Sequence, residues 1–405
     1  MKDHKRKQYF SKHEQMDFEV QCVLGGCYYG GADVGEVLAT IERIDQGDFE
    51  SWYQEWYATA ARIQRIATQC AAEGNQVSAR RAYLRSANYY ACANVMIDGT
   101  KDVSRRVPTW EKHLECWDEF CARLSPPSEK IEIPYEETPM PGYFFKPADS
   151  GEPLATIIFN NGSDASTSGL WSLGVAAALE RGYAALVFDG PGQNAMLWRY
   201  NVLFRYDWEK VITPVVDYLL SRDDIDPARV ALSGVSQGGY WVIRALAYEH
   251  RIAAGIADPG VVDVYTAMQH QIPKHLLRLL DAGDEERFNK EMDLGLRFSG
   301  AEARQNMAWR MKPYGTDSYY KCLKEAQRFN VRDVIQTVKC PMFIADPEDE
   351  QFWPGQSQQA YEALTCPKTI VKFTSAEGAN WHCEPKARSL YDQRMFDWLA
   401  QVMPA

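Results

Sequence analysis

The sequence has little that would hold a metal ion or a disulfide framework. Its ten cysteines are scattered without a Cys-x-x-Cys pair, and no cluster of histidines lies near them. Structural zinc sites and secreted disulfide scaffolds both depend on regularly spaced ligands of this kind. We therefore expect reduced thiols, no metal site and no cofactor.

Long apolar runs and an excess of positive charge are also missing. No stretch has the roughly 20 apolar residues that span a bilayer, and the N-terminal segment MKDHKRKQYFSKHEQMDFEV lacks the apolar centre of a secretory signal. The formal net charge of −11 repels phosphate backbones and anionic headgroups. We expect a cytoplasmic protein that binds neither nucleic acid nor membranes and whose partner is a small-molecule substrate.

The 405 residues exceed one average domain, and the pattern of the sequence changes at Pro126 and Pro127. Helical periodicity dominates before the prolines, in segments such as DFESWYQEWYATAARIQRIATQCAAEG, which Gly74 is expected to terminate. Residues 1–127 are therefore predicted to form a helical domain, and residues 128–405 a larger one.

Short apolar runs alternate with amphipathic segments after the prolines, and each run ends near a Gly, Asp or Asn. The runs are KIEIPYE, GYFFKPA, ATIIFNNG, YAALVFDGPG, RVALSGVS, IAAGIADPG, CPMFIADPE and TIVKFTSAEG. The first two predict a hairpin, and the remainder predict an α/β fold with a mostly parallel eight-stranded sheet between helices. Residues 259–338 are too long for a crossover and are predicted to form a helical cap.

The segment LSGVSQGG places Ser236 between a predicted strand and a predicted helix. Gly234 and Gly238 complete a G-x-S-x-G pattern, which in this context is the nucleophile elbow of serine hydrolases. The sharp turn exposes the hydroxyl above the sheet, and the N-terminus of the helix faces developing negative charge. Ser236 is thus the predicted nucleophile.

A serine nucleophile needs a base and an acid, which in this fold follow it along the chain. His382, in SAEGANWHCEP, is the histidine that lies late enough. The segment IADPEDEQFWPG offers four carboxylates within five residues, at Asp346, Glu348, Asp349 and Glu350. Counting about nine residues on from Pro341 leads to Glu350, so we rank Glu350 first, Asp349 second and Asp346 third.

An oxyanion hole requires two backbone N–H groups directed at one oxygen. The residue after the nucleophile, Gln237, is expected to supply one of them. The segment FNNGSDAST after the third run is expected to supply the other through Ser163 or Asp164, with Gly162 turning the backbone toward the serine.

Aromatic residues in the two helical segments suit a flat, oxygenated substrate. We consider Tyr89 and Tyr90 in the N-terminal helices, and Trp309 and Tyr314 in the cap, as substrate-binding candidates. Packing in the interior is the alternative for each of them.

The ordered motifs NNGSD, FDGPGQ, GVSQGG, DPEDEQFWPGQ and EGANWHCEP, after a helical N-terminal domain, resemble one subfamily of α/β-hydrolases. It contains the pseudooxynicotine hydrolase of nicotine breakdown and fungal hydrolases that shorten polyketide chains. The resemblance implies an α/β-hydrolase core with Ser236 and His382 as catalytic residues. It also implies that the helical domain serves as a lid or in dimerisation, with a homodimer as the common state. This sequence departs at Glu350, because aspartate commonly holds that place.

The sequence and the resemblance together predict a serine hydrolase that acts on a ketone or ester of an aromatic or polyketide-like compound, with hydrolysis of a carbon–carbon bond beside a ketone as one such reaction. Two alternatives remain open: an esterase or acyltransferase of secondary metabolism, and a binding subunit without catalysis.

Overall fold

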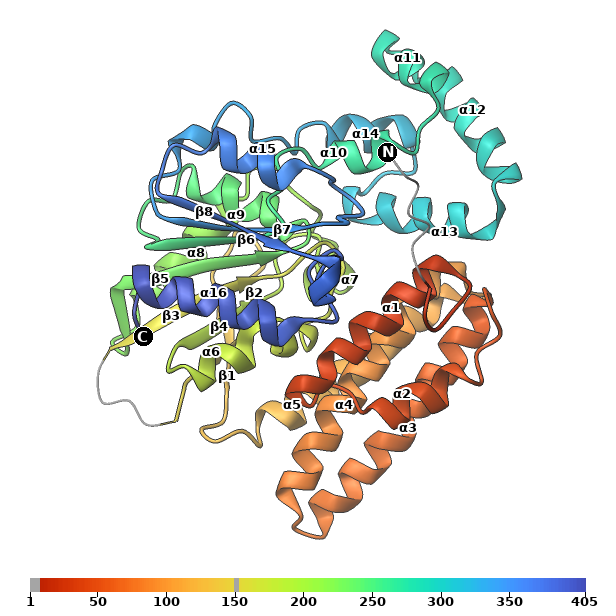
Figure 1. Ribbon diagram of the computed structural model, residues 1–405. Coiled ribbons are helices and arrows are strands. Elements are labelled where there is room, and N and C mark those ends of the chain that lie inside the picture. Colours follow the sequence, from red (N-terminus) through yellow and green to blue (C-terminus); the bar gives the residue numbers. More distant parts are fainter. Residues whose placement is uncertain (1–7, 149–152) are drawn as a thin grey trace. The chain divides into compact units, whose positions relative to one another are not determined.

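The computed structural model describes residues 8–148 and 153–405 (Figure 1). The chain divides between Leu124 and Ser125 into two compact units.

The first unit is helical. It contains α1 (Glu14–Gly25), α2 (Val34–Ile41), α3 (Phe49–Ala72), α4 (Gln76–Val95) and α5 (Arg106–Cys121), with 3₁₀ turns at Gly26–Tyr29, Ile97–Gly99 and Val103–Arg105. The carboxylate of Asp48 caps α3 by accepting two backbone N–H groups. Gly74, with φ of 80°, lies just beyond the end of α3 as predicted, and α4 folds back against α3. Trp52, Trp56 and Trp117 are buried among these helices.

The second unit is built on one eight-stranded sheet. Its strands are β1 (Glu129–Ile133), β2 (Met140–Phe145), β3 (Leu154–Asn160), β4 (Ala184–Phe188), β5 (Ile225–Val235), β6 (Ala254–Asp258), β7 (Met342–Pro347) and β8 (Lys368–Phe373). They lie in the order β1-β2-β4-β3-β5-β6-β7-β8. β1 and β2 form an antiparallel hairpin, β2 is antiparallel to β4, and the pairs from β4 through β8 are parallel. The prediction of a mostly parallel sheet is confirmed.

Helices cover both faces of the sheet. They are α6 (Ala176–Glu180), α7 (Asn194–Trp198), α8 (Glu209–Leu220), α9 (Gly238–Leu246), α15 (Gln356–Ala363) and α16 (Arg388–Val402). Figure 1 shows α9 and α15 on one face and α6 and α16 on the other. Every residue of β3, β4 and β6 is buried, as expected for strands covered on both sides.

The cap follows β6 and precedes β7. It consists of α10 (Tyr265–Gln269), α11 (Lys274–Ala282), α12 (Glu285–Phe298), α13 (Gly300–Met311) and α14 (Tyr319–Ala326), with 3₁₀ turns at Lys312–Tyr314 and Ile335–Thr337. These helices have a small apolar core of their own, which includes Leu280, Phe288 and Leu323. In the part of the chain that the structure describes, no helix has the length and apolar character needed to cross a membrane.

Candidate active site

Ser236 lies on the sharp turn between β5 and α9. Its φ of 58° places it in the left-handed region, which costs a residue other than glycine about 1–2 kcal/mol. The backbone N–H of Ser236 donates to the carbonyl oxygen of Asp258 at 2.6 Å and helps to hold this conformation. A Cβ on Gly234 would lie 2.4 Å from the carbonyl oxygen of Gly238, so only glycine permits the strand and helix to approach this closely.

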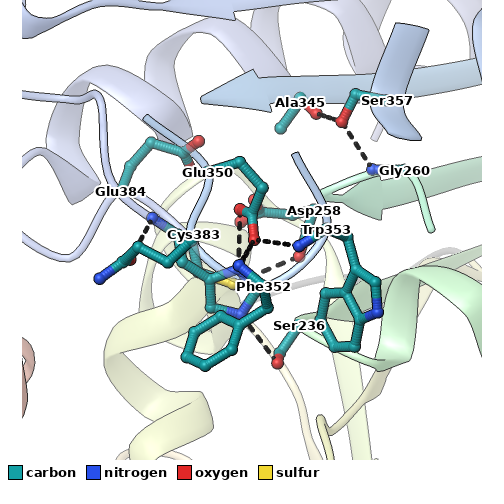
Figure 2. Close-up of polar contacts among 12 residues, drawn as sticks. Ser236, Asp258, Gly260, Ala345, Glu350, Phe352, Trp353, Ser357, Cys383 and Glu384 are labelled. Atoms are coloured by element: carbon teal, nitrogen blue, oxygen red, sulfur yellow. Dashed lines mark hydrogen bonds and ion pairs between the residues drawn. The ribbon is translucent and has the colours of Figure 1, made fainter. Parts of the chain in front are cut away.

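His382 reaches Ser236 from the loop that follows β8. Its Nε2 lies 2.9 Å from the Ser236 Oγ. The imidazole is buried, and the ring of Phe352 packs edge-on against it with centroids 4.7 Å apart. Figure 2 shows Ser236, Phe352 and Glu350 gathered at this point.

Of the three candidate acids, Glu350 is the one that contacts His382. Its two carboxylate oxygens lie 2.8 and 2.9 Å from the His382 Nδ1. Asp349 instead accepts a hydrogen bond from the Asn380 side chain at 2.6 Å, and Asp346 pairs with Lys372 at 2.9 Å. The structure therefore brings the first-ranked acid to the histidine and gives the other two different partners.

The turn after β7 is built around the Glu350 carboxylate. Its Oε1 also accepts the backbone N–H of Phe352 at 2.9 Å and that of Trp353 at 3.2 Å. Burial raises the pKa of Glu350, but the contact with His382 and these two N–H groups outweigh burial and lower it. Glu350 is thus ionised and fixed in direction.

The pKa of His382 moves the other way. Burial alone lowers it, whereas the negative charges of Glu350, Asp258 and Asp164 outweigh burial and raise it. A raised pKa means that the protonated imidazole is stabilised at this position. Ser236, His382 and Glu350 therefore form a hydrogen-bonded chain in which His382 can accept a proton and hold it.

The loop after β3 passes directly over the nucleophile. A Cβ on Gly162 would lie 2.9 Å from the Cβ of Ser236, a contact that no side chain tolerates. Ser163 and Asp164 follow in this loop, and the Ser163 hydroxyl donates to the Asp164 carboxylate at 3.3 Å. The side chain of Asp164 is exposed. Gln237, the other predicted donor, is the N-cap of α9 and directly follows Ser236.

The sequence reasoning missed Gln193, whose side chain holds this loop. Its Nε2 donates to the carbonyl oxygens of Asn161 at 3.1 Å and Gly162 at 2.8 Å, and its Oε1 accepts the Gly190 N–H at 2.8 Å. The C=O and N–H of a trans peptide point in opposite directions, so fixing the Gly162 carbonyl also fixes the Ser163 N–H. The FDGPGQ motif that ends in Gln193 was the available signal.

The two tyrosines of the first unit that were predicted to bind substrate are buried in the interior of that unit. Tyr89 and Tyr90 are 0% and 2% exposed. The Tyr89 hydroxyl donates to Glu36 at 2.8 Å and accepts the Asp33 N–H, while the Tyr90 hydroxyl donates to Gln64 at 2.8 Å. Both hydroxyls are therefore committed to bonds within the helical unit, which corrects their assignment as substrate-binding groups.

The two cap aromatics have different surroundings. Trp309 on α13 is partly exposed, and the guanidinium of Arg310 lies 5.7 Å from its ring centroid. Tyr314 packs edge-on against Phe204 and Phe329, each with ring centroids 5.6 Å away. Tyr314 thus joins the cap to the core. Among the residues that the structure describes, no group of three His, Cys, Asp or Glu side chains is arranged to hold a metal ion.

Comparison with known proteins gives relatives that match nearly the full chain. Hydrolase acrC of Aspergillus aculeatus is 31% identical over 412 residues, covering 94% of this chain and 95% of that protein. The 20-hydroxy-prefusarin hydrolase FUS2 of Gibberella moniliformis is 29% identical over 402 residues, with 95% of each chain covered. The prolyl oligopeptidase family matches residues 171–295.

Two solved structures share the fold over both units. The 2,6-dihydroxy-pseudo-oxynicotine hydrolase gives a TM-score of 0.74 at 20% identity and covers 94% of this chain and 95% of its own. AbyA5 gives a TM-score of 0.63 at 13% identity, with 94% and 95% covered. The predicted α/β-hydrolase fold is confirmed.

Proposed function

Because this chain belongs to the α/β-hydrolase family of the fungal hydrolases related to acrC and is itself a hydrolase, we propose that it cleaves its substrate through a covalent intermediate on Ser236. The observation that carries the proposal is the hydrogen-bonded chain from the Ser236 Oγ through both ring nitrogens of His382 to Glu350. It has the order of groups that serine hydrolases use to activate a hydroxyl.

In the first step, His382 Nε2 accepts the Ser236 hydroxyl proton while Oγ attacks the carbonyl carbon of the substrate. Glu350 accepts the hydrogen bond from Nδ1–H and stabilises the imidazolium that forms. The backbone N–H groups of Gln237 and Ser163 donate to the developing oxyanion. The tetrahedral intermediate then collapses, and His382 gives its proton to the leaving group.

In the second step, water attacks the acyl group on Ser236 and His382 accepts a proton from that water. The acid product leaves, and Ser236 regains its proton. The leaving group of the first step is an alcohol for an ester. For a ketone it is a carbanion stabilised by a neighbouring carbonyl group, which departs as the protonated carbon compound.

The proposed substrate is a ketone or ester in a polyketide-like or aromatic compound of secondary metabolism. The support is the name of one relative, the 20-hydroxy-prefusarin hydrolase FUS2, which gives 20-hydroxy-prefusarin as the compound that FUS2 hydrolyses. Trp309 in the cap is our candidate for contact with the substrate, because its ring is partly exposed.

Labelling with a fluorophosphonate tests the nucleophile. Wild type should be labelled at Ser236, and Ser236→Ala should not, because the covalent route is removed. Ser221→Ala, which changes an exposed serine at the end of α8, is the matched control and should label as wild type does. Wild type that resists labelling while a reference esterase reacts would instead favour a binding subunit.

Mass spectrometry of product mixtures tests the reaction. Panels of β-diketones and esters are incubated with wild type and with Ser236→Ala, and turnover should fall by about 10⁴-fold or more in the variant. Cleavage of a β-diketone to an acid and a ketone supports carbon–carbon hydrolysis, whereas cleavage of esters alone identifies an esterase. Transfer of the acyl group to an added alcohol without release of acid would replace the proposal with an acyltransferase.

A further inference from the structure

A cluster of buried ionisable residues lies behind His382 and takes no part in the reaction proposed above. Asp258 ends β6, Glu384 follows His382 in the same loop, and Arg388 begins α16. These three residues are 0%, 0% and 3% exposed. Arg388 Nη1 lies 3.3 Å from Asp258 Oδ2 and 3.9 Å from Glu384 Oε2.

The same residues connect the nucleophile to the histidine loop. The carbonyl oxygen of Asp258 accepts the Ser236 N–H at 2.6 Å and the Cys383 thiol at 3.3 Å. Arg388 Nη1 in turn donates to the carbonyl oxygen of Cys383 at 2.9 Å. Figure 2 shows Asp258, Cys383 and Glu384 around this junction. Asp258 is therefore bonded to the residue that bears the nucleophile and to the neighbour of the general base.

The histidine loop needs such support because it is strained. Cys383 and Glu384 have φ angles of 58° and 43°. Two consecutive residues in the left-handed region are unfavourable for side chains other than glycine and persist only where their surroundings hold them. Here the restraints are the bonds of Cys383 to Asp258 and Arg388, and the Glu384 N–H bond to the Trp381 carbonyl at 2.8 Å.

Of the carboxyl oxygens of Asp258 and Glu384, only Asp258 Oδ2 has a hydrogen-bond donor in the described part of the chain, which is Arg388 Nη1 at 3.3 Å. Within residues 8–148 and 153–405, neither Asp258 Oδ1 nor either oxygen of Glu384 has an N–H or O–H partner. Both carboxyl groups nevertheless face the same nitrogen, Arg388 Nη1, so the two buried acids share one cationic partner. One proton shared between Asp258 and Glu384 supplies the missing donor. Arg388 then faces one negative charge from this pair and the carboxylate of Asp392, whose Oδ1 lies 3.8 Å from Arg388 Nη2. Two bare carboxylates at Asp258 and Glu384 would instead repel each other in a buried site.

We propose that Glu384 is a neutral carboxylic acid that donates its proton to Asp258, and that this acid pair with Arg388 is a positioning device that holds His382 against Ser236. Burial and the negative charge of Asp258 raise the pKa of Glu384 well above its ordinary value, in the direction that this protonation state requires. The positioning role rests on the function proposed above, whereas the protonation state of Glu384 stands independently of it.

Glu384→Gln separates a neutral acid from an ionised one. A carboxamide has the same shape and donates an N–H to Asp258 in place of the O–H, while the charge of the site does not change. We expect kcat within about threefold of wild type in this variant. Glu384→Ala removes the donor and leaves Asp258 unsatisfied, which should lower kcat by about 10- to 100-fold.

Infrared spectroscopy detects the proton directly. The spectrum of wild type minus that of Glu384→Gln at pH 8 should contain the carbonyl stretching band of a buried protonated carboxyl group, and the band should shift in D₂O. Glu377→Gln is the matched control, because the pKa of this exposed carboxyl is lowered to about 2, chiefly by its hydrogen bond to Arg394. The difference spectrum for that variant should lack the band. Absence of the band from the Glu384→Gln difference spectrum would overturn the proposal.

The pH profile provides the second readout. Glu350, Asp258 and Asp164 are the carboxylates whose charge acts on His382, and a neutral Glu384 adds nothing to them. The acid limb of the rate of fluorophosphonate labelling should therefore coincide in wild type and Glu384→Gln. A shift of that limb to lower pH in Glu384→Gln would mean that a negative charge had been lost, and would overturn the neutral state.

The positioning role has its own criterion. Equal kcat values in Glu384→Ala and Glu384→Gln would contradict the positioning role, even if the infrared band is present. Failure of the proposed function would look different, because wild type itself would then resist the fluorophosphonate while the infrared band persisted. If Glu384→Ala does not fold, Glu384→Asp, whose shorter acid draws the proton away from Asp258, takes its place with the same expected loss.

Discussion

Glu350 shows at the level of one residue how the acid of this site is selected. Glutamate is one methylene longer than the usual aspartate, and the turn after β7 accommodates that length by directing the backbone N–H groups of Phe352 and Trp353 at the carboxylate. The carboxylate then has both oxygens within 2.9 Å of His382 Nδ1. The role of Glu350 thus depends on how this turn is folded.

Exchanging the acids one at a time tests this assignment. Glu350→Gln should lower kcat by about 10³-fold or more, because a carboxamide does not stabilise the imidazolium and can hold the wrong tautomer. Asp349→Asn is the matched variant and should lose less than about tenfold, since Asp349 serves the Asn380 side chain instead. The comparison is made by steady-state kinetics on one substrate. The reverse ranking would transfer the role to Asp349.

The pH dependence of Ser236 reactivity follows from the raised pKa of His382. His382 acts as a base only when neutral, so reactivity is complete above this pKa and is lost as the pH falls through it. Removing the charge of Glu350 takes away the largest of the effects that raise the pKa, so the acid limb in Glu350→Gln should move to lower pH. The rate of fluorophosphonate labelling between pH 4 and 9 measures both limbs. An unmoved limb would show that Glu350 does not act on His382.

Gln193 gives a separate prediction for the oxyanion loop. Gln193→Glu replaces the donor that holds the Asn161 and Gly162 carbonyls with an acceptor, so the peptide that carries the Ser163 N–H should rotate. We expect kcat to fall by about 10²-fold, the usual cost of one oxyanion donor, with little change in KM. Gln358→Glu, at an exposed position on α15, is the control. If Gln193→Glu has the kcat of wild type, Gln193 does not position the Ser163 N–H for catalysis.

Ser236 and His382 could be located from the sequence because both lie in patterns that local chemistry imposes. The glycines around Ser236 are needed for the close approach of β5 and α9, and they can be seen in the sequence. The sequence alone does not identify the triad acid, and it does not show that Tyr89 is buried. Residues 346–350 contain four carboxylates, and periodicity does not distinguish one from another. The burial of Tyr89 against Glu36 depends on how helices far apart in the sequence pack. Such contacts are set by tertiary structure.

At the scale of elements, the apolar runs predicted the strands and their order of appearance, but not their limits or their neighbours. β5 begins at Ile225, four residues before the predicted run, because Leu154 of β3 pairs with Ile225 across an irregularity in the ladder. The position of β4 between β2 and β3 is likewise a property of the whole sheet. Local hydrophobicity does not encode either feature.

His113 on α5 makes the helical unit sensitive to acid. Its Nδ1 bonds to the Ala87 carbonyl of α4 at 3.0 Å, and burial lowers its pKa from 6.5 to about 4. In the unfolded chain this histidine binds a proton near pH 6.5, whereas in the folded unit it does so only near pH 4. The free energy of unfolding is therefore highest above pH 6.5 and decreases as the pH falls from 6.5 to 4. The loss amounts to about 3 kcal/mol.

Denaturant unfolding at pH 7 and pH 4.5, followed by helical circular dichroism, measures this effect. His113→Asn keeps a donor for the Ala87 carbonyl but does not titrate. Between pH 7 and pH 4.5 its unfolding free energy should therefore change by about 2 kcal/mol less than that of wild type. His275→Asn, at an exposed position on α11, should behave as wild type does. Equal pH dependence in all three proteins would show that His113 does not control acid unfolding.

At the scale of the whole molecule, the groups of the proposed reaction all belong to one unit. Ser236, His382 and Glu350, together with the supports at Gln193 and Arg388, lie within residues 125–405. The first unit has a core of its own, in which Trp56 and Trp117 are fully buried. We propose that this helical unit serves in covering the substrate or in forming a homodimer, and the two roles are separable from the reactivity of the serine.

A fragment that begins at Ser125 tests this separation. Because the contacts of Ser236 and His382 described above come from residues 125–405, the folded fragment should react with a fluorophosphonate at Ser236 at a rate within about threefold of that of the full chain. Circular dichroism and light scattering of the same samples establish folding and molar mass. A monomeric fragment from a dimeric parent, with full turnover of the substrate, would assign the helical unit to dimerisation. Retained labelling with lost turnover would assign it to the substrate. A folded fragment that no longer reacts would contradict the prediction, because Ser236 would then need the helical unit for its activation.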